Sequence, residues 1–179
     1  CIIEYGYEGT SVSKIAKKAE LSAGAMQYHF KAKIDAIKAA IGYLYEKRLA
    51  DRDRDTGKIK GNPLIDGIAI YWNHLNQDYF VAYQELVIAA RTHPDLSSAL
   101  KPAYQDFIVT YREQSEKQFP IWAANSEKFS LVADLIQYVL EGLAYGRLND
   151  QISDEKTQKL LHLTTQLAKS WSDQNFTKN

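Results

Sequence analysis

The sequence predicts an all-α protein, and its periodicity and composition are the observations behind that prediction. Apolar residues recur at intervals of three and four along the 179-residue chain, and no strict alternation lasts long enough for a strand. A content of 45% hydrophobic and 25% charged residues is typical of a soluble globular protein, and one cysteine excludes a disulfide framework. The spacing predicts helices at about residues 1–5, 11–18, 22–29, 33–54, 63–76, 78–92, 102–118, 127–148 and 154–172.

Charge and capping residues indicate how the chain is organised. The net charge of zero hides an asymmetry, because residues 1–60 hold 12 Lys and Arg against 8 Asp and Glu, whereas residues 61–179 hold 10 against 14. A basic first part could meet a polyanion, although such an offset is also ordinary surface variation. Asn62 followed by Pro63 is a helix start after the charged, glycine-bearing stretch from Asp51, and this stretch separates two parts of the chain.

Two short helices joined by a tight turn are predicted in TSVSKIAKKAELSAGAMQYHF, residues 10–30. The first helix has one apolar face, Glu20 and Leu21 interrupt it, and Met26 and Phe30 resume it on the second helix. Ser22 is placed to cap the second helix. This pattern predicts a helix-turn-helix motif.

The second helix of this motif has a slim outer face once Met26 and Phe30 point to the core. Small, amide and phenol side chains suit contacts to base edges in the major groove, and lysines and helix amino ends suit phosphates. Each lysine taken alone is more simply a solvated residue, but their convergence on one motif favours DNA contact. The DNA-binding candidates are Thr10, Lys14, Ser22, Ala23, Ala25, Gln27, Tyr28, His29, Lys31 and Lys33.

The segment GYEGTSVSKIAKKAELSAGAMQYHFKAKIDAIKAAI, residues 6–41, resembles the amino-terminal DNA-binding region of the TetR family of transcriptional regulators. The family pattern has a "GY..T" turn, a turn and recognition helix of the form "A..AGVS.G.(L/I)YYHF..K", and a following helix rich in alanine and leucine. The matching residues are Gly6, Tyr7, Thr10, Ile15, Ala16, Ala19, Ser22, Gly24, Tyr28, His29, Phe30 and Lys33.

Two residues depart from that pattern. Glu20 stands where glycine is usual in the turn, and Gln27 stands where tyrosine is most frequent, which suggests a base preference of this protein's own. By resemblance, Tyr28, His29 and Lys33 are DNA and phosphate contacts. The family's first helix normally begins well before Cys1, so the first helix here is expected to be incomplete.

The resemblance also implies the arrangement of domains. It predicts a helix-turn-helix DNA-binding domain at residues 1–50, a connecting segment at 51–62, and a larger helical bundle at 63–179 for ligand binding and dimerisation. The run from Tyr83 to Phe107 resembles a segment of one TetR subgroup with an "AARTDP.L...L.P" pattern, and it names no effector.

Aromatic residues are unusually frequent in the second part of the sequence. For any one of them a place in the core is the simpler interpretation, but a buried tyrosine hydroxyl needs a partner. Many tyrosines in one bundle are therefore consistent with a partly polar cavity for a small amphipathic or aromatic effector. The ligand-binding candidates are Tyr71, Trp72, Tyr83, Arg91, Phe107, Tyr111 and Tyr138.

The last two predicted helices carry more apolar surface than one side can bury. FSLVADLIQYVLEGLAYGRL, residues 129–148, is apolar nearly all round, and the final helix has a stripe at three-four spacing. In the resembled family, two such helices from each subunit form a four-helix interface, and we expect a homodimer here. The interface candidates are Leu135, Ile136, Leu140, Leu143, Leu160, Leu163, Leu167 and Trp171.

The resemblance implies a ligand-responsive regulator that binds a double-stranded, palindromic DNA operator as a homodimer, most simply a repressor. We expect no cofactor, no metal and a cytoplasmic location without membrane association, since no apolar run reaches the roughly 20 residues of a membrane span. An enzyme is the less favoured alternative, because the four histidines are scattered and no HExxH, GxSxG or phosphate-binding loop occurs. A helical ligand-binding protein without DNA activity is the other alternative.

Overall fold

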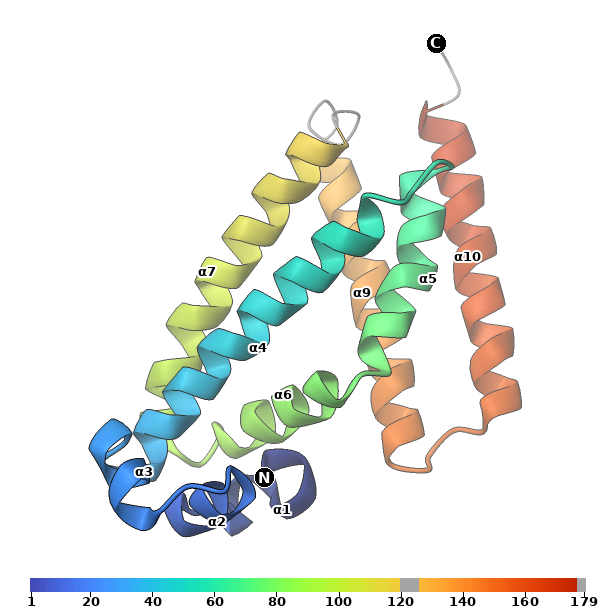
Figure 1. Ribbon diagram of the computed structural model, residues 1–179. Helices are drawn as coiled ribbons and strands as arrows, with labels where there is room; N and C mark the ends of the chain where they lie inside the picture. Colours follow the sequence, from blue (N-terminus) through green and yellow to red (C-terminus); the bar gives the residue numbers. More distant parts are fainter. Residues whose placement is uncertain (120–125, 177–179) are drawn as a thin grey trace. The chain divides into compact units, whose positions relative to one another are not determined.

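The computed structural model describes residues 1–119 and 126–176, and every regular element within these ranges is a helix. The predicted all-α fold is confirmed. The helices are α1 (Ile2–Gly9), α2 (Val12–Lys18), α3 (Ala23–His29), α4 (Lys33–Thr56), α5 (Pro63–Leu75), α6 (Asp78–Ala89), α7 (Pro94–Gln118), α9 (Ser126–Leu148) and α10 (Asp154–Phe176), as labelled in Figure 1.

The helices belong to two compact units. Unit 1 comprises residues 1–49 and 77–111, and unit 2 comprises the described residues of the ranges 50–76 and 112–179. The predicted domain limits at residues 50 and 62 stay a prediction, because the units follow the packing of helices rather than the order of the chain.

Unit 1 contains the three short helices together with α6 and the adjoining parts of α4 and α7. Helix α1 packs against α6, and α2 packs against α3. Apolar residues of α4 recur every three or four positions and therefore share one face of the helix. This face packs against α6 and α7. The buried core of this unit consists of Tyr7, Ile37, Ile41, Tyr45, Leu86, Leu96, Leu100 and Phe107.

Unit 2 is built on α5, α9 and α10, which pack on one another in pairs (Figure 1). Asn62 caps α5 as predicted, since its Oδ1 accepts a hydrogen bond from Leu64 N at 2.9 Å. The Asn62 Nδ2 also donates to Ser172 Oγ at 2.9 Å, which joins the start of α5 to α10. Leu140 is completely buried and Phe129 lies against Trp171, so α9 contributes one face to this core.

Helix α7 differs from its prediction. We expected a helix to begin at residue 102, but α7 begins at Pro94 and continues through Pro102. A proline removes one backbone hydrogen bond from a helix interior. Pro102 and Ser98, whose carbonyl loses that bond, are both exposed, so water can hydrate the freed carbonyl and the helix continues.

Among the described residues, no helix combines the length and apolar character that crossing a bilayer requires.

Candidate DNA-binding motif

Helices α2 and α3 form the predicted helix-turn-helix, and each begins at a serine cap. Ser11 Oγ accepts a hydrogen bond from Lys14 N at 3.3 Å, and Ser22 Oγ accepts one from Ala25 N at 3.1 Å. Short helices are marginal on their own, so such caps and the packing beneath them fix where each helix starts.

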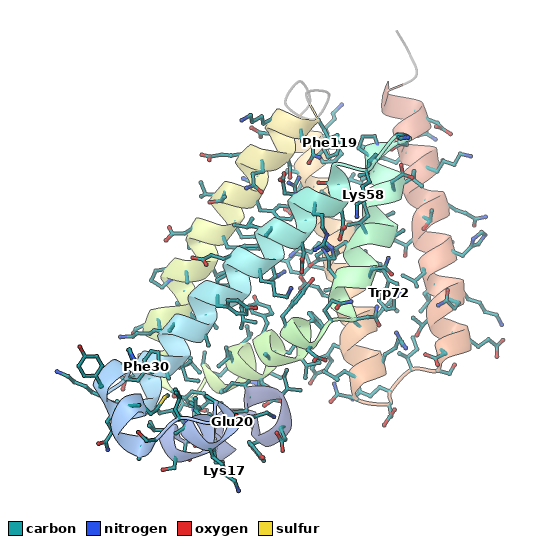
Figure 2. All side chains as sticks on the ribbon, in the orientation of Figure 1. Lys17, Glu20, Phe30, Lys58, Trp72 and Phe119 are labelled. Carbon is teal, nitrogen blue, oxygen red and sulfur yellow. The ribbon has the colours of Figure 1, made fainter. Side chains whose placement is uncertain are left out.

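A small apolar core holds the two helices together. Met26 of α3 is 2% exposed and packs with the buried Ala16 of α2 and Ala36 of α4. Phe30 is partly buried against the same cluster, at the junction of α3 and α4 (Figure 2). The predicted inward positions of Met26 and Phe30 are therefore confirmed, and alanine at position 16 allows the helices to approach closely.

The turn between the helices has the backbone conformation that normally favours glycine. Glu20, labelled in Figure 2, has a positive φ of 55°. A Cβ atom in this left-handed region crowds the following carbonyl group, at a cost of about 1–2 kcal/mol. The geometry explains why glycine is usual at this position in the resembled family and identifies Glu20 as a strained residue.

The outer face of α3 is open. Tyr28 is 85% exposed, and Gln27, His29 and Ala23 are exposed beside it. Ala25 is partly buried, and Ser22 uses its hydroxyl to cap the helix. The face is thus slim and polar, with one large ring that makes only an edge contact to His29, at a ring-centroid distance of 5.2 Å.

Several predicted phosphate contacts are engaged within unit 1. Thr10 is buried and its Oγ1 donates to Gly6 O at 2.7 Å, so the hydroxyl is part of the fold. Lys14 Nζ donates to Gly9 O at 2.7 Å, and Lys33 Nζ donates to Tyr7 O at 2.8 Å. The Lys33 ammonium also lies 3.9 Å from the centre of the Tyr7 ring. Among the predicted phosphate contacts, Lys31 and His29 are exposed side chains.

Helix α1 packs against α6 and also contacts the motif and the segment that follows α6. Gly6 interrupts it with φ of 64° and ψ of −179°, which directs Tyr7 into the core. The Tyr7 ring meets the ring of His93 at a centroid distance of 4.9 Å, and Glu8 pairs with His93. Lys18 of α2 pairs with Glu4 of α1. These contacts fix the motif to the body of unit 1.

The predicted ligand-binding residues divide between the units. In unit 1, Phe107 and Tyr111 lie on one face with ring centroids 5.8 Å apart, as their spacing predicts, while Arg91 is exposed. Tyr83 packs against Tyr45 at a centroid distance of 6.1 Å. Which of these residues meets an effector stays a prediction.

The remaining ligand-binding candidates lie in unit 2. Tyr71 Oη donates to Glu141 Oε1 at 2.5 Å, so its hydroxyl has a partner within the unit. The guanidinium of Arg147 lies 5.8 Å from the Trp72 ring centre. Tyr138 is 66% exposed and therefore belongs to the surface of α9.

The predicted interface residues also divide by burial. Leu140 and Leu143 are buried within unit 2, because a helix that is apolar all round must cover one face with its own neighbours. Leu135 is 64% exposed and Leu167 is 63% exposed. Leu163 is also exposed. The partly buried candidates are Ile136, Leu160 and Trp171.

Sequence reasoning missed Tyr45 and Arg48. Both lie on α4 in the stripe that begins with Ile37 and Ile41, and Arg48 lies over the rings of Tyr83 and Phe107. A signal was available, since an arginine that continues a buried apolar stripe at three-four spacing is unusual.

His74 and His93 each lie beside a carboxylate, in different units of the described structure. His74 Nε2 is 3.0 Å from Asp55 Oδ2, and His93 pairs with Glu8 in the other unit. No group of three His, Cys, Asp or Glu side chains that could hold a metal ion occurs among residues 1–119 and 126–176.

Comparison with known proteins finds a family model that matches the first part of the chain and solved structures that share its fold. Residues 1–40 match the model of the bacterial regulatory proteins of the tetR family. A protein from Rhodococcus sp. described as a TetR-family transcriptional regulator is 22% identical, with a TM-score of 0.69 over 93% of this chain and 92% of that chain. GusR of Salmonella enterica is 19% identical, with a TM-score of 0.62 over 94% of this chain and 90% of that chain.

A third solved structure is the multidrug binding protein EbrR complexed with imidazole. It is 19% identical, with a TM-score of 0.57 over 91% of this chain and 87% of that chain. At these identities, the likeness to solved structures shows a shared fold. No curated protein matches the sequence.

A capped helix-turn-helix with an open second helix is the arrangement with which DNA-binding regulators enter a major groove. The family match at residues 1–40 and the shared fold together support a TetR-family regulator. The resemblance predicted from residues 6–41 is confirmed.

Proposed function

We propose that the protein is a ligand-responsive repressor that binds a palindromic operator as a homodimer and releases it when a small molecule binds. The observation that carries the proposal is the open face of α3, where Gln27 and Tyr28 are exposed while Met26 anchors the opposite face. A helix so presented can enter a major groove, and glutamine matches the edge of adenine.

DNA binding is tested by selecting sequences from random DNA with the full-length protein. The affinity for the selected sequence is then measured over a series of salt concentrations. We expect steeply weakening affinity as salt rises, because phosphate contacts release counterions. If binding is absent or does not depend on salt, the proposed DNA-binding function is wrong. The protein would then be better described as a helical ligand-binding protein without DNA activity.

The dimer is supported by apolar side chains that unit 2 leaves exposed. Leu131, Leu135 and Tyr138 recur at four and three positions on α9, and Leu163 and Leu167 on α10. Helices α9 and α10 pack on each other, so both present apolar surface within one unit. A second copy would cover these side chains and would pair two recognition helices, as a palindromic operator requires.

Release by an effector requires that the effector bind the DNA-competent and DNA-incompetent states with different affinities. Helix α4 is the candidate link, because it begins at Lys33 directly after the motif and carries the aromatic core residue Tyr45. EbrR is a multidrug binding protein of the same fold, which supports small-molecule binding here. Screening compounds for release of the selected DNA tests the proposal, and unchanged affinity under a saturating bound compound would contradict the coupling.

A further inference from the structure

Arg48 is a partly buried arginine beside the core of unit 1. It follows Tyr45 by three positions on the buried face of α4. Its guanidinium carbon lies 4.6 Å from the ring centre of Phe107, 5.1 Å from that of Tyr83 and 6.0 Å from that of Tyr45. Three aromatic rings from α4, α6 and α7 therefore surround one permanently charged group.

The charge of Arg48 has no counterpart in the described residues. Its Nη1 atom is buried without a hydrogen-bond partner, and no ion pair links the guanidinium to residues 1–119 or 126–176. Contacts to ring faces offset part of the desolvation cost of a partly buried cation, but they do not use its N–H donors. An anion with two oxygens matches the fork of donors that the guanidinium presents.

Tyr45 adds a second donor at the same place. Its hydroxyl is buried without a hydrogen-bond partner of standard geometry among the described residues, and the Tyr83 hydroxyl is the neighbour with which it interacts. Burial, and next the nearby Tyr83, raise the pKa of Tyr45, so the phenol stays protonated at neutral pH and can donate. The Tyr45 ring stacks on Phe107 at a centroid distance of 4.9 Å, which fixes its orientation.

We propose that Arg48 and Tyr45 bind the carboxylate of a small aromatic acid, and that such acids are the effector class of this regulator. The inference rests on the proposed function, to which it adds the chemistry of the effector. Tyr83 and Phe107 supply flat apolar surface beside the guanidinium, and a planar ring attached to the carboxylate can pack on it.

The test compares matched acids and amides on the full-length protein. Benzoate, phenylacetate and 3-phenylpropanoate are titrated by calorimetry alongside benzamide, phenylacetamide and 3-phenylpropanamide. We expect at least one acid to bind at least about tenfold more tightly than its amide, since the pair differ chiefly in the charge that Arg48 recognises. Equal affinity within every pair, or no binding of any acid at millimolar concentration, would overturn the proposal.

Variants assign the preference to Arg48. In Arg48→Gln the preference for the acid is expected to disappear, whereas Lys38→Gln, which removes an exposed positive charge from the same helix, is expected to keep it. Arg48→Lys keeps the charge without the fork, so an intermediate preference is expected, and this variant serves if Arg48→Gln does not fold. An acid preference that survives in folded Arg48→Gln or is unchanged in Arg48→Lys would show that another group binds the carboxylate.

A parallel measurement separates this inference from the proposed function. Binding of the selected DNA is measured for the wild type with and without the acid that binds best. Intact DNA binding without acid preference contradicts the effector class alone, whereas absence of specific DNA binding contradicts the regulator itself. An acid that binds through Arg48 and leaves DNA affinity unchanged would contradict its role as effector.

Discussion

Glu20 has a backbone conformation that disfavours any side chain. Its φ of 55° lies in the left-handed region, which glycine adopts without crowding. Glu20→Gly is therefore expected to raise the free energy of unfolding by about 1 kcal/mol, measured by urea denaturation. Glu20→Ala removes the carboxylate but keeps the crowding, so this control is expected to give no gain; equal stabilisation by both variants would assign the effect to charge.

Gly6 is the opposite case, in which the sequence already has glycine where the backbone demands it. Its φ of 64° and ψ of −179° form a conformation essentially restricted to glycine, and an added Cβ would lie 3.1 Å from Glu85 Oε2. Gly6→Ala is expected to lower the free energy of unfolding by about 1–3 kcal/mol.

Gly42 of α4 provides the matched control for Gly6. A Cβ there would meet nothing within 4 Å, so Gly42→Ala is expected to stabilise the helix by about 1 kcal/mol. Both variants are compared by thermal and urea unfolding, and a destabilisation of the same size in the two would contradict a special role of the Gly6 backbone.

Asp55 should make stability depend on pH in the acid range. Hydrogen bonds from Arg54, then His74 and Lys58, hold the pKa of this carboxyl well below its ordinary value. A depressed pKa contributes stability above the unfolded value of about 3.9, and the contribution is lost as pH falls. Asp55→Asn is expected to cost about 1 kcal/mol near neutral pH and progressively less below about pH 4.

Urea unfolding at a series of pH values measures this dependence. Asp53 is exposed on the same helix, so Asp53→Asn is the control and should show little effect at any pH. A cost of Asp55→Asn that does not shrink on acidification would indicate lost packing rather than lost charge.

At the scale of the element, substitutions on the two faces of α3 should have different effects: those on the inner face lower stability, and those on the outer face lower DNA affinity. Met26 is buried against Ala16, so Met26→Ala is expected to cost about 2–5 kcal/mol in the free energy of unfolding. Tyr28 is exposed, and Tyr28→Ala is expected to change stability by less than about 0.5 kcal/mol while strongly weakening operator binding.

Tyr43→Ala is the matched control for Tyr28→Ala. Tyr43 is an exposed tyrosine of α4 in the same unit, outside the helix-turn-helix. Its loss should change neither stability nor DNA affinity appreciably. Equal thermal destabilisation by Met26→Ala and Tyr28→Ala would show that the faces of α3 were assigned wrongly.

Periodicity predicted the elements better than it predicted their partners. The positions of Met26 and Phe30 followed from three-four spacing, because burial on one face is what produces that pattern. The pattern does not state which neighbour covers a face, so Leu140 proved buried in its own unit although Leu135, on the same helix, is exposed. Pro102 lies inside α7 although proline usually interrupts a helix, because the carbonyl that loses its hydrogen bond is exposed to water.

At the scale of the whole molecule, the exposed apolar side chains of α9 and α10 should decide oligomeric state. Leu135→Glu and Leu167→Glu place a charge in the proposed interface, and burying it would be costly. Each variant is expected to raise the dimer dissociation constant by at least about tenfold, measured by sedimentation equilibrium.

Val109→Glu controls for adding a charge to an exposed apolar position elsewhere, on α7 in unit 1. It should leave the dimer intact. A wild-type protein that sediments as a monomer, or variants that associate as tightly as the wild type, would contradict the proposed interface.

The pairing of lysines within unit 1 determines how much charge remains for DNA. Lys14 and Lys33 donate to backbone carbonyls, and Lys18 pairs with Glu4. If these contacts persist when the protein binds DNA, few lysines of each motif remain to contact phosphates, chiefly Lys17 and Lys31. Each neutralised phosphate contributes about −0.9 to the slope of log affinity against log salt. The measured slope therefore indicates how many lysines exchange their contacts within unit 1 for contacts to DNA phosphates.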